Sequence, residues 1–107
     1  HCFYCLVAHG SAVRELSNDP QLGERIAANF RSAELPKKQE ELLNFTKKLT
    51  KDPSEIGEND RQKLKDVGYT DRDIWDISAI VGLFNMTNRL ASATEMEPNS
   101  NYHNLAR

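Results

Sequence analysis

The sequence lacks the features that mark several specialised classes of protein. Its 14 basic residues are interspersed with 16 acidic ones, for a net charge of −2, so we expect no nucleic-acid partner. Its longest apolar stretch, residues 77–84, is interrupted by a serine and a glycine. That stretch is far shorter than the roughly 18 residues of a membrane span, so we expect no membrane partner either. We find no signal peptide, no repeat, no low-complexity segment and no convincing strand.

Cysteine is also scarce, because Cys2 and Cys5 are the only two and lie three residues apart. A disulfide that stabilises a secreted protein is expected to join distant segments. A tight pair in a chain without an export signal instead indicates a redox or metal-binding role. We therefore predict a cytoplasmic protein.

The residues that are present fit one small domain. Apolar residues make up 38% of the chain and charged residues 28%, which is typical of a soluble globular protein. We assign residues 1–107 to a single domain, and we expect a native N-terminal part to precede it, because the chain opens inside an apparent motif. The apolar fraction is low for so short a chain, so we expect an oligomer in which copies cover each other's apolar faces.

The apolar spacing predicts an all-α bundle of about five helices with short connections. The expected helices cover about residues 2–16, 20–30, 36–51, 59–67 and 71–94. Asp19 and Thr70 are the expected N-caps, Pro20 suits a first helical position and Gly68 suits a helix stop. Between residues 77 and 84 the last helix is apolar nearly all round, which predicts burial on several sides. The tail from residue 95 onward is polar and turn-rich.

The segment most informative about chemistry contains Cys2, Cys5 and His9. If it is helical, the three side chains fall within roughly 60° of one another around the helix axis. Cys5 and His9 are one turn apart and can touch. Cys2 lies at or near the helix start, where unpaired amides stabilise negative charge.

This set supplies a nucleophile, a base and a second thiol. The thiolate is the reactive form of cysteine, and a neighbouring imidazole can remove the thiol proton. A peroxide substrate fits, because the thiolate becomes a sulfenic acid that the other thiol condenses with to form a disulfide. An external reductant, either a disulfide-reducing protein or a small thiol, must then reopen the disulfide.

The two cysteines compete for the nucleophilic role. Helix polarity favours Cys2 as the more acidic thiol, whereas proximity to His9 favours Cys5. We give the histidine more weight, because it can both accept and relay a proton. We therefore assign Cys5 as the nucleophile and Cys2 as the proton donor and resolving thiol.

Two other interpretations of the cysteine pair stay open. The pair can be incidental, because small buried cysteines are common. Alternatively, Cys2, Cys5 and His9, with His1 as a fourth ligand, can surround zinc. Zinc fingers usually draw ligands from two separated pairs, and His103 is the only distant candidate here, so we expect no metal and no other cofactor.

Residues 2–9 resemble the Cys-x-x-Cys-x-x-x-His signature of the alkylhydroperoxidase D (AhpD) family, within the carboxymuconolactone decarboxylase-like superfamily. Residues 84–91 resemble that family's Asn-x-x-Asn-Arg segment, and residues 98–107 are similar to the tail of its peroxidase-related subgroup. The resemblance implies an all-helical fold, assembly into trimers or hexamers, and thiol-dependent reduction of hydroperoxides. It also implies that Cys5 forms the sulfenic acid, that Cys2 donates a proton and that His9 belongs to a proton relay.

The sequence departs from this family in two places. The family's relay includes a glutamate about eleven residues before the first cysteine, a position that this sequence does not contain. Where some members carry a histidine between the cysteines, this sequence has Tyr4, whose pKa makes it a poor base.

Several other residues have a packing role and a functional role to weigh. Asn85 and Asn88, next to Arg89, lie in an apolar helix, where buried amides must find partners, and we favour a packing role over a place near the thiols. We expect Phe3 and Trp75 to pack. We expect Tyr102, His103 and Arg107 to dock the tail rather than to take part in chemistry.

Three other functions compete with a peroxidase. A lactone reaction of the carboxymuconolactone decarboxylase type is disfavoured, because it has no evident need for a thiol pair. A non-enzymatic metal-binding or redox-sensing module would hold metal tightly. A purely structural oligomer subunit would tolerate loss of either cysteine.

Overall fold

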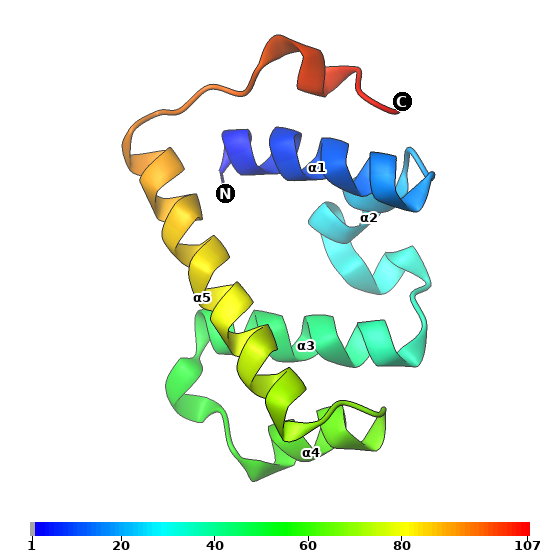
Figure 1. Ribbon diagram of the computed structural model, residues 1–107, viewed down its shortest axis with the longest axis vertical. Coiled ribbons are helices and arrows are strands. Elements are labelled where there is room, and N and C mark those ends of the chain that lie inside the picture. Colours follow the sequence, from blue (N-terminus) through cyan, green and yellow to red (C-terminus); the bar gives the residue numbers. More distant parts are fainter. Residues whose placement is uncertain (1) are drawn as a thin grey trace. The chain divides into compact units, whose positions relative to one another are not determined.

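The computed structural model describes residues 2–107, and all of its regular elements are helical (Figure 1). The α-helices are α1 (Phe3–Ser17), α2 (Leu22–Asn29), α3 (Lys37–Lys51), α4 (Glu58–Asp66) and α5 (Asp71–Ala93). The 3-10 helices are η1 (Phe30–Ala33), η2 (Pro53–Glu55) and η3 (Ser100–His103). Residues 2–107 contain no strand, which confirms the prediction of an all-α fold with five helices. In the same residues no helix has the length and apolar character that crossing a membrane requires.

The chain forms two compact units. The terminal unit consists of the described residues up to 34 together with residues 87–107, and so contains α1, α2, η1, the end of α5 and η3. The central unit consists of residues 35–86 and contains α3, η2, α4 and most of α5. The candidate thiol residues lie in the terminal unit.

The first helix begins and ends within one residue of its predicted bounds. Cys2 is its N-cap in an extended conformation, and Asn18 ends it with a left-handed φ of 59°. The Asn18 amide donates to the Arg14 carbonyl at 3.0 Å, which satisfies one of the last carbonyls of the helix. Asparagine tolerates this conformation better than most residues, so the sequence itself stops the helix here.

The predicted start of the second helix is wrong by two residues. α2 begins at Leu22 with Gln21 as its N-cap. Asp19 does not cap the helix, because its Oδ1 accepts from the Gln21 amide at 2.9 Å. A carboxylate that bonds the amide two residues ahead makes an Asx-turn, so the chain turns once more before the helix starts.

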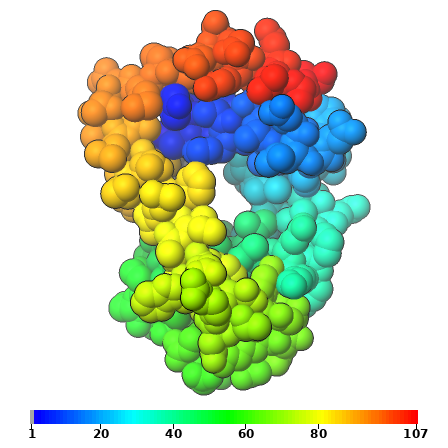
Figure 2. Space-filling model, in the orientation of Figure 1, coloured from blue at the N-terminus to red at the C-terminus, as the bar shows by residue number. Residues whose placement is uncertain are grey.

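The C-terminal segment docks on α1 of its own chain. Arg14 donates through Nε to the Leu105 carbonyl at 2.9 Å and through Nη2 to the Tyr102 carbonyl at 2.8 Å. Figure 2 shows this segment, in orange and red, lying along the blue α1. The docking role predicted for the tail is thereby confirmed, and Arg14, which the sequence did not mark, contributes two of the contacts.

The central unit has a small core made by three buried side chains, Phe45, Leu64 and Ile74. They come from α3, α4 and α5 respectively. Other apolar side chains pack against this cluster: Leu49, Ile56, Tyr69 and Ile77. Leu64 is fully buried, so this core holds α4 against α3 and α5.

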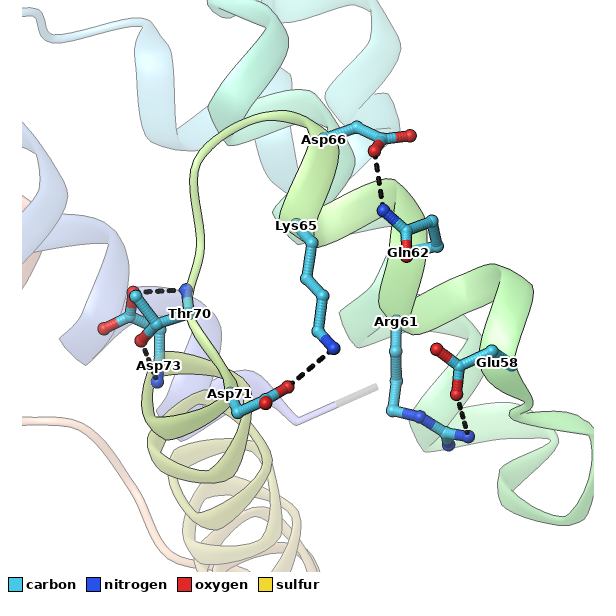
Figure 3. A network of polar contacts seen from close by, with 8 residues as sticks. All are labelled: Glu58, Arg61, Gln62, Lys65, Asp66, Thr70, Asp71 and Asp73. Carbon is cyan, nitrogen blue, oxygen red and sulfur yellow. Dashed lines mark hydrogen bonds and ion pairs between the residues drawn. The ribbon is translucent and has the colours of Figure 1, made fainter.

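The turn between α4 and α5 is held by polar contacts (Figure 3). Gly68 has a φ of 103°, a conformation that residues with a Cβ rarely adopt, and it ends α4 as predicted. The Thr70 hydroxyl accepts from the Asp73 amide at 3.1 Å, and the Asp73 carboxylate accepts from the Thr70 amide at 2.8 Å. The first bond confirms Thr70 as the predicted N-cap, and the two bonds together form a capping box. Lys65 pairs with Asp71 across the turn at 2.8 Å.

α5 is buried on one side and exposed on another. Ile74 and Val81 are each 8% exposed, whereas Leu83 is 52% and Trp75 74% exposed. Within this chain, the expected burial on several sides and the expected packing of Trp75 are therefore wrong. The apolar pattern of a sequence does not distinguish a helix buried in its own chain from one with a bare apolar side.

Candidate functional site

The two cysteines lie at the start of α1 and form a disulfide. Cys2 is the N-cap and Cys5 is the third residue of the helix, with 5.2 Å between their Cα atoms. The Cys5 amide donates to the Cys2 sulfur at 3.2 Å. The helix start thus brings both sulfurs within bonding distance, and it directs an amide at one of them.

His9 follows Cys5 by one turn on the same helix. The segment is helical from Phe3 onward, so residues 5 and 9 lie on the same side of the helix. The imidazole is exposed, whereas both cysteines are half-buried. His9 therefore lies on an exposed side of α1, one turn beyond Cys5.

A groove of about 940 Å³ opens beside the disulfide. Its lining is contributed by α1, α2 and the end of α5: Cys2, Phe3, Cys5, Leu6, Glu24, Ala27, Ala28 and Asn88. The residues that α2 contributes are two alanines and Glu24, and α5 contributes Asn88. Glu24 and Asn88 are therefore the polar side chains that these two helices add. The groove can hold an organic molecule against the sulfurs.

The two asparagines of α5 have different places. Asn88 lines the groove next to the cysteines. Asn85 belongs to the central unit and donates to the Thr50 hydroxyl at 3.2 Å. The packing role that we favoured for both residues therefore describes Asn85, whereas Asn88 lies at the site.

Glu24 is a groove residue that the sequence did not reveal. It lies in the first turn of α2, and its carboxylate pairs with Arg107 at 2.7 Å. Both side chains are about half exposed, so water screens the pair. Nothing in the local pattern around residue 24 marks it, because its position depends on how α2 packs on α1.

Among residues 2–107, Cys2 and Cys5 come together in the disulfide, but no histidine joins them in a metal site. In that range no three His, Cys, Asp or Glu side chains are arranged to hold a metal ion. The distant candidate, His103, contacts Phe3, with 6.0 Å between the ring centroids. His1, the fourth ligand considered, lies outside the described residues.

The protein is similar to solved structures of one family. No family model matches the chain, and no curated protein matches it. Among solved structures, it is similar to an uncharacterized peroxidase-related protein from Silicibacter sp. TM1040, with 57% identity and a TM-score of 0.97. It is also similar to an uncharacterized peroxidase-related protein from Ralstonia eutropha JMP134, an alkylhydroperoxidase AhpD core, with 37% identity and a TM-score of 0.95.

Each of these matches covers 99% of this chain and 56% of the other protein. The chain therefore spans little more than half the length of either relative. Near-identical backbone geometry together with 37–57% identity over almost the whole chain exceeds what a shared fold alone produces. The chain belongs to the AhpD-like family of peroxidase-related proteins.

Proposed function

We propose that the protein is a thiol-dependent peroxidase that reduces hydroperoxides through the Cys2–Cys5 pair. The observation that carries this proposal is the pair itself, which lies at a helix start and opens on a groove of about 940 Å³. A dithiol in such a place is accessible, and its sulfurs are near a helix N-terminus that stabilises negative charge. Membership of a peroxidase-related family supports the same chemistry.

The reaction begins from the reduced dithiol. The Cys5 thiolate attacks one oxygen of the hydroperoxide, the O–O bond breaks, and the other oxygen leaves as an alcohol or as water after taking a proton. Cys5 is then a sulfenic acid. The Cys2 sulfur attacks the Cys5 sulfur and displaces water, which leaves the disulfide. A disulfide-reducing protein or a small thiol returns two electrons and two protons.

Two neighbouring groups favour different cysteines as the nucleophile. The Cys5 amide that donates to the Cys2 sulfur stabilises a thiolate on Cys2. His9, one turn beyond Cys5, favours proton removal from Cys5. We keep Cys5 as the nucleophile, because its thiol proton and the proton of the leaving group can both pass through one imidazole.

Asn88 supports substrate binding in this scheme. It lines the groove with both cysteines, and an amide can donate to one peroxide oxygen while accepting from the hydroxyl. The apolar residues of the same groove, among them Phe3 and Leu6, suit the organic part of a hydroperoxide.

Intact-mass measurement after one equivalent of hydroperoxide tests the proposal. The reduced protein should lose two hydrogens. Cys2→Ser should stop at the sulfenic acid of Cys5 and gain one oxygen, whereas Cys5→Ser should lose turnover. Undiminished peroxidase activity in Cys5→Ser would remove Cys5 from the nucleophilic role, and activity in the double Cys→Ser variant would end the thiol mechanism.

A further inference from the structure

We propose that a second, smaller pocket in the terminal unit binds a small organic carboxylate. This pocket has a volume of about 150 Å³ and lies between α1, α2 and the C-terminal segment. Four of its lining residues carry charge or an imidazole, namely Arg14, Glu24, His103 and Arg107. It is separate from the cysteines, which line only the larger groove.

Among the lining residues, Arg14 most strongly indicates that the pocket binds an anion. Its residue is only 5% exposed. It donates to two neutral carbonyls through Nε and Nη2, and no described carboxylate pairs with it. Its Nη1 donates to no described acceptor. A buried guanidinium without a counter-charge is unfavourable, and an anion in the adjoining pocket would compensate it.

Arg107 adds a second cation to the same pocket. Its Nε donates to the His103 carbonyl at 2.6 Å and its Nη1 to Glu24 at 2.7 Å. These bonds leave its Nη2 without a described acceptor. Two guanidinium groups thus face one carboxylate, and the pocket carries an excess positive charge even with His103 neutral.

The size and the walls of the pocket define the ligand. A volume of about 150 Å³ is the space of about five water molecules. Leu6 and Val7 provide apolar wall beside the charged groups. A carboxylate on a chain of two to four carbons fits both the charged groups and the apolar wall. The guanidinium nitrogens pair with its oxygens, and its short carbon chain contacts the apolar side.

Glu24 gives this proposal its sharpest test. Its carboxylate occupies Arg107 in the same way as a ligand carboxylate would. Removing that charge with Glu24→Gln should therefore strengthen binding, whereas a merely structural pocket would gain nothing. Arg14 holds the tail through two bonds that do not involve Glu24, so the tail stays docked in this variant.

The experiment uses the disulfide form of the protein, with propionate as the probe and propionamide as its neutral counterpart. Calorimetry measures affinity, and the NMR signals of the His103 ring report on the site. We expect propionate to bind and to shift those signals, and propionamide to bind about tenfold more weakly or worse. Glu24→Gln should tighten propionate binding, and Arg107→Gln should weaken it about tenfold or more.

Arg25→Gln is the matched control, because Arg25 is an exposed cation of α2 that bonds Gln21 and does not line the pocket. The affinity of this variant for propionate should equal that of the parent protein. If the tail is released in Glu24→Gln, Arg107→Lys serves as the test variant instead. Lysine keeps the ion pair with Glu24 but lacks the second guanidinium nitrogen, so this variant should bind propionate more weakly. Equal binding of propionamide, or equal loss in Arg25→Gln and Arg107→Gln, would overturn the proposal.

Discussion

At the scale of single residues, Cys2 combines two roles that usually belong to different side chains. Its sulfur caps α1 by accepting the Cys5 amide at 3.2 Å, and the same sulfur is half of the disulfide. A serine at this position would also cap the helix. Cys2→Ser therefore removes the redox chemistry of residue 2 while the helix start is kept, which makes it a clean variant for trapping an oxidised Cys5.

The role of His9 is predicted to appear in the rate of thiol oxidation. In His9→Gln the peroxide should oxidise the reduced protein about 100-fold more slowly, because a positioned base and acid is lost. The disulfide should still form at the end of the reaction, since both sulfurs remain. Stopped-flow kinetics at neutral pH measures this rate for the reduced parent protein and for the variant.

His103→Gln is the matched control for His9, because it removes an imidazole that contacts Phe3 and does not line the groove beside the cysteines. We expect its oxidation rate to stay within about threefold of the parent value, as for a residue outside the reaction. An equal loss of rate in both variants would mean that His9 has no special place in the mechanism.

Asp60 gives a prediction about stability and pH. The Gly57 amide, which donates to its carboxylate at 2.9 Å, and the Lys48 ammonium at 3.0 Å hold the pKa of Asp60 below its usual range. A lowered folded-state pKa stabilises the fold above the unfolded value of about 3.9, and this stabilisation is lost as the pH falls through the folded value.

Asp60→Asn should therefore lower the free energy of unfolding by about 1–2 kcal/mol at pH 7. The difference from the parent should shrink as the pH falls below about 3.9. Urea unfolding at neutral and acid pH measures both values. Glu55→Gln, an exposed residue of η2, removes the same charge and should change little. A deficit that persists in acid would contradict the assignment to the charged carboxylate.

The sequence revealed those site residues whose relation is local. Cys2, Cys5 and His9 fall within two turns of one helix, so helical geometry alone relates them. Glu24 and Asn88 come to the groove from α2 and α5. Their positions depend on helix packing, which a periodic pattern does not specify, so they could not be predicted.

At the scale of elements, helix ends were predictable where one side chain decides them. Thr70 and Gly68 act on the neighbouring backbone alone, and both are in their predicted roles. The start of α2 was wrong because Asp19 had two local options, a helix cap or an Asx-turn, and took the turn. Such a choice depends on where the preceding helix directs the chain, which the local sequence does not state.

The capping box of α5 is predicted to contribute measurably to stability. Thr70→Ala removes the hydroxyl that accepts from the Asp73 amide, so the free energy of unfolding should fall by about 1 kcal/mol. Thr70→Ser keeps the acceptor and should lie within about 0.5 kcal/mol of the parent. Thermal or urea unfolding of the three proteins gives these values. Equal losses in both variants would show that the methyl group, not the cap, matters.

At the scale of the whole molecule, α5 has apolar surface that residues 2–107 leave exposed. Trp75, Leu83 and Met86 are 74%, 52% and 54% exposed. At 100° per residue they fall within about 80° of one another, on the side opposite to the buried Ile74 and Val81. The sequence showed that this helix is apolar, but only the structure separates its covered side from its bare one.

The trimer or hexamer that the family resemblance implies should use this bare side of α5. The parent protein should sediment as a closed oligomer, whereas the double variant Leu83→Glu and Met86→Glu should dissociate about tenfold more readily or beyond, because each interface would bury unpaired carboxylates. Sedimentation velocity over a range of concentrations measures this. Gln39→Glu adds a charge at an exposed position of α3 and should leave the oligomer intact. A monomeric parent protein, or a double variant that assembles as the parent does, would exclude this side of α5 as the contact between copies.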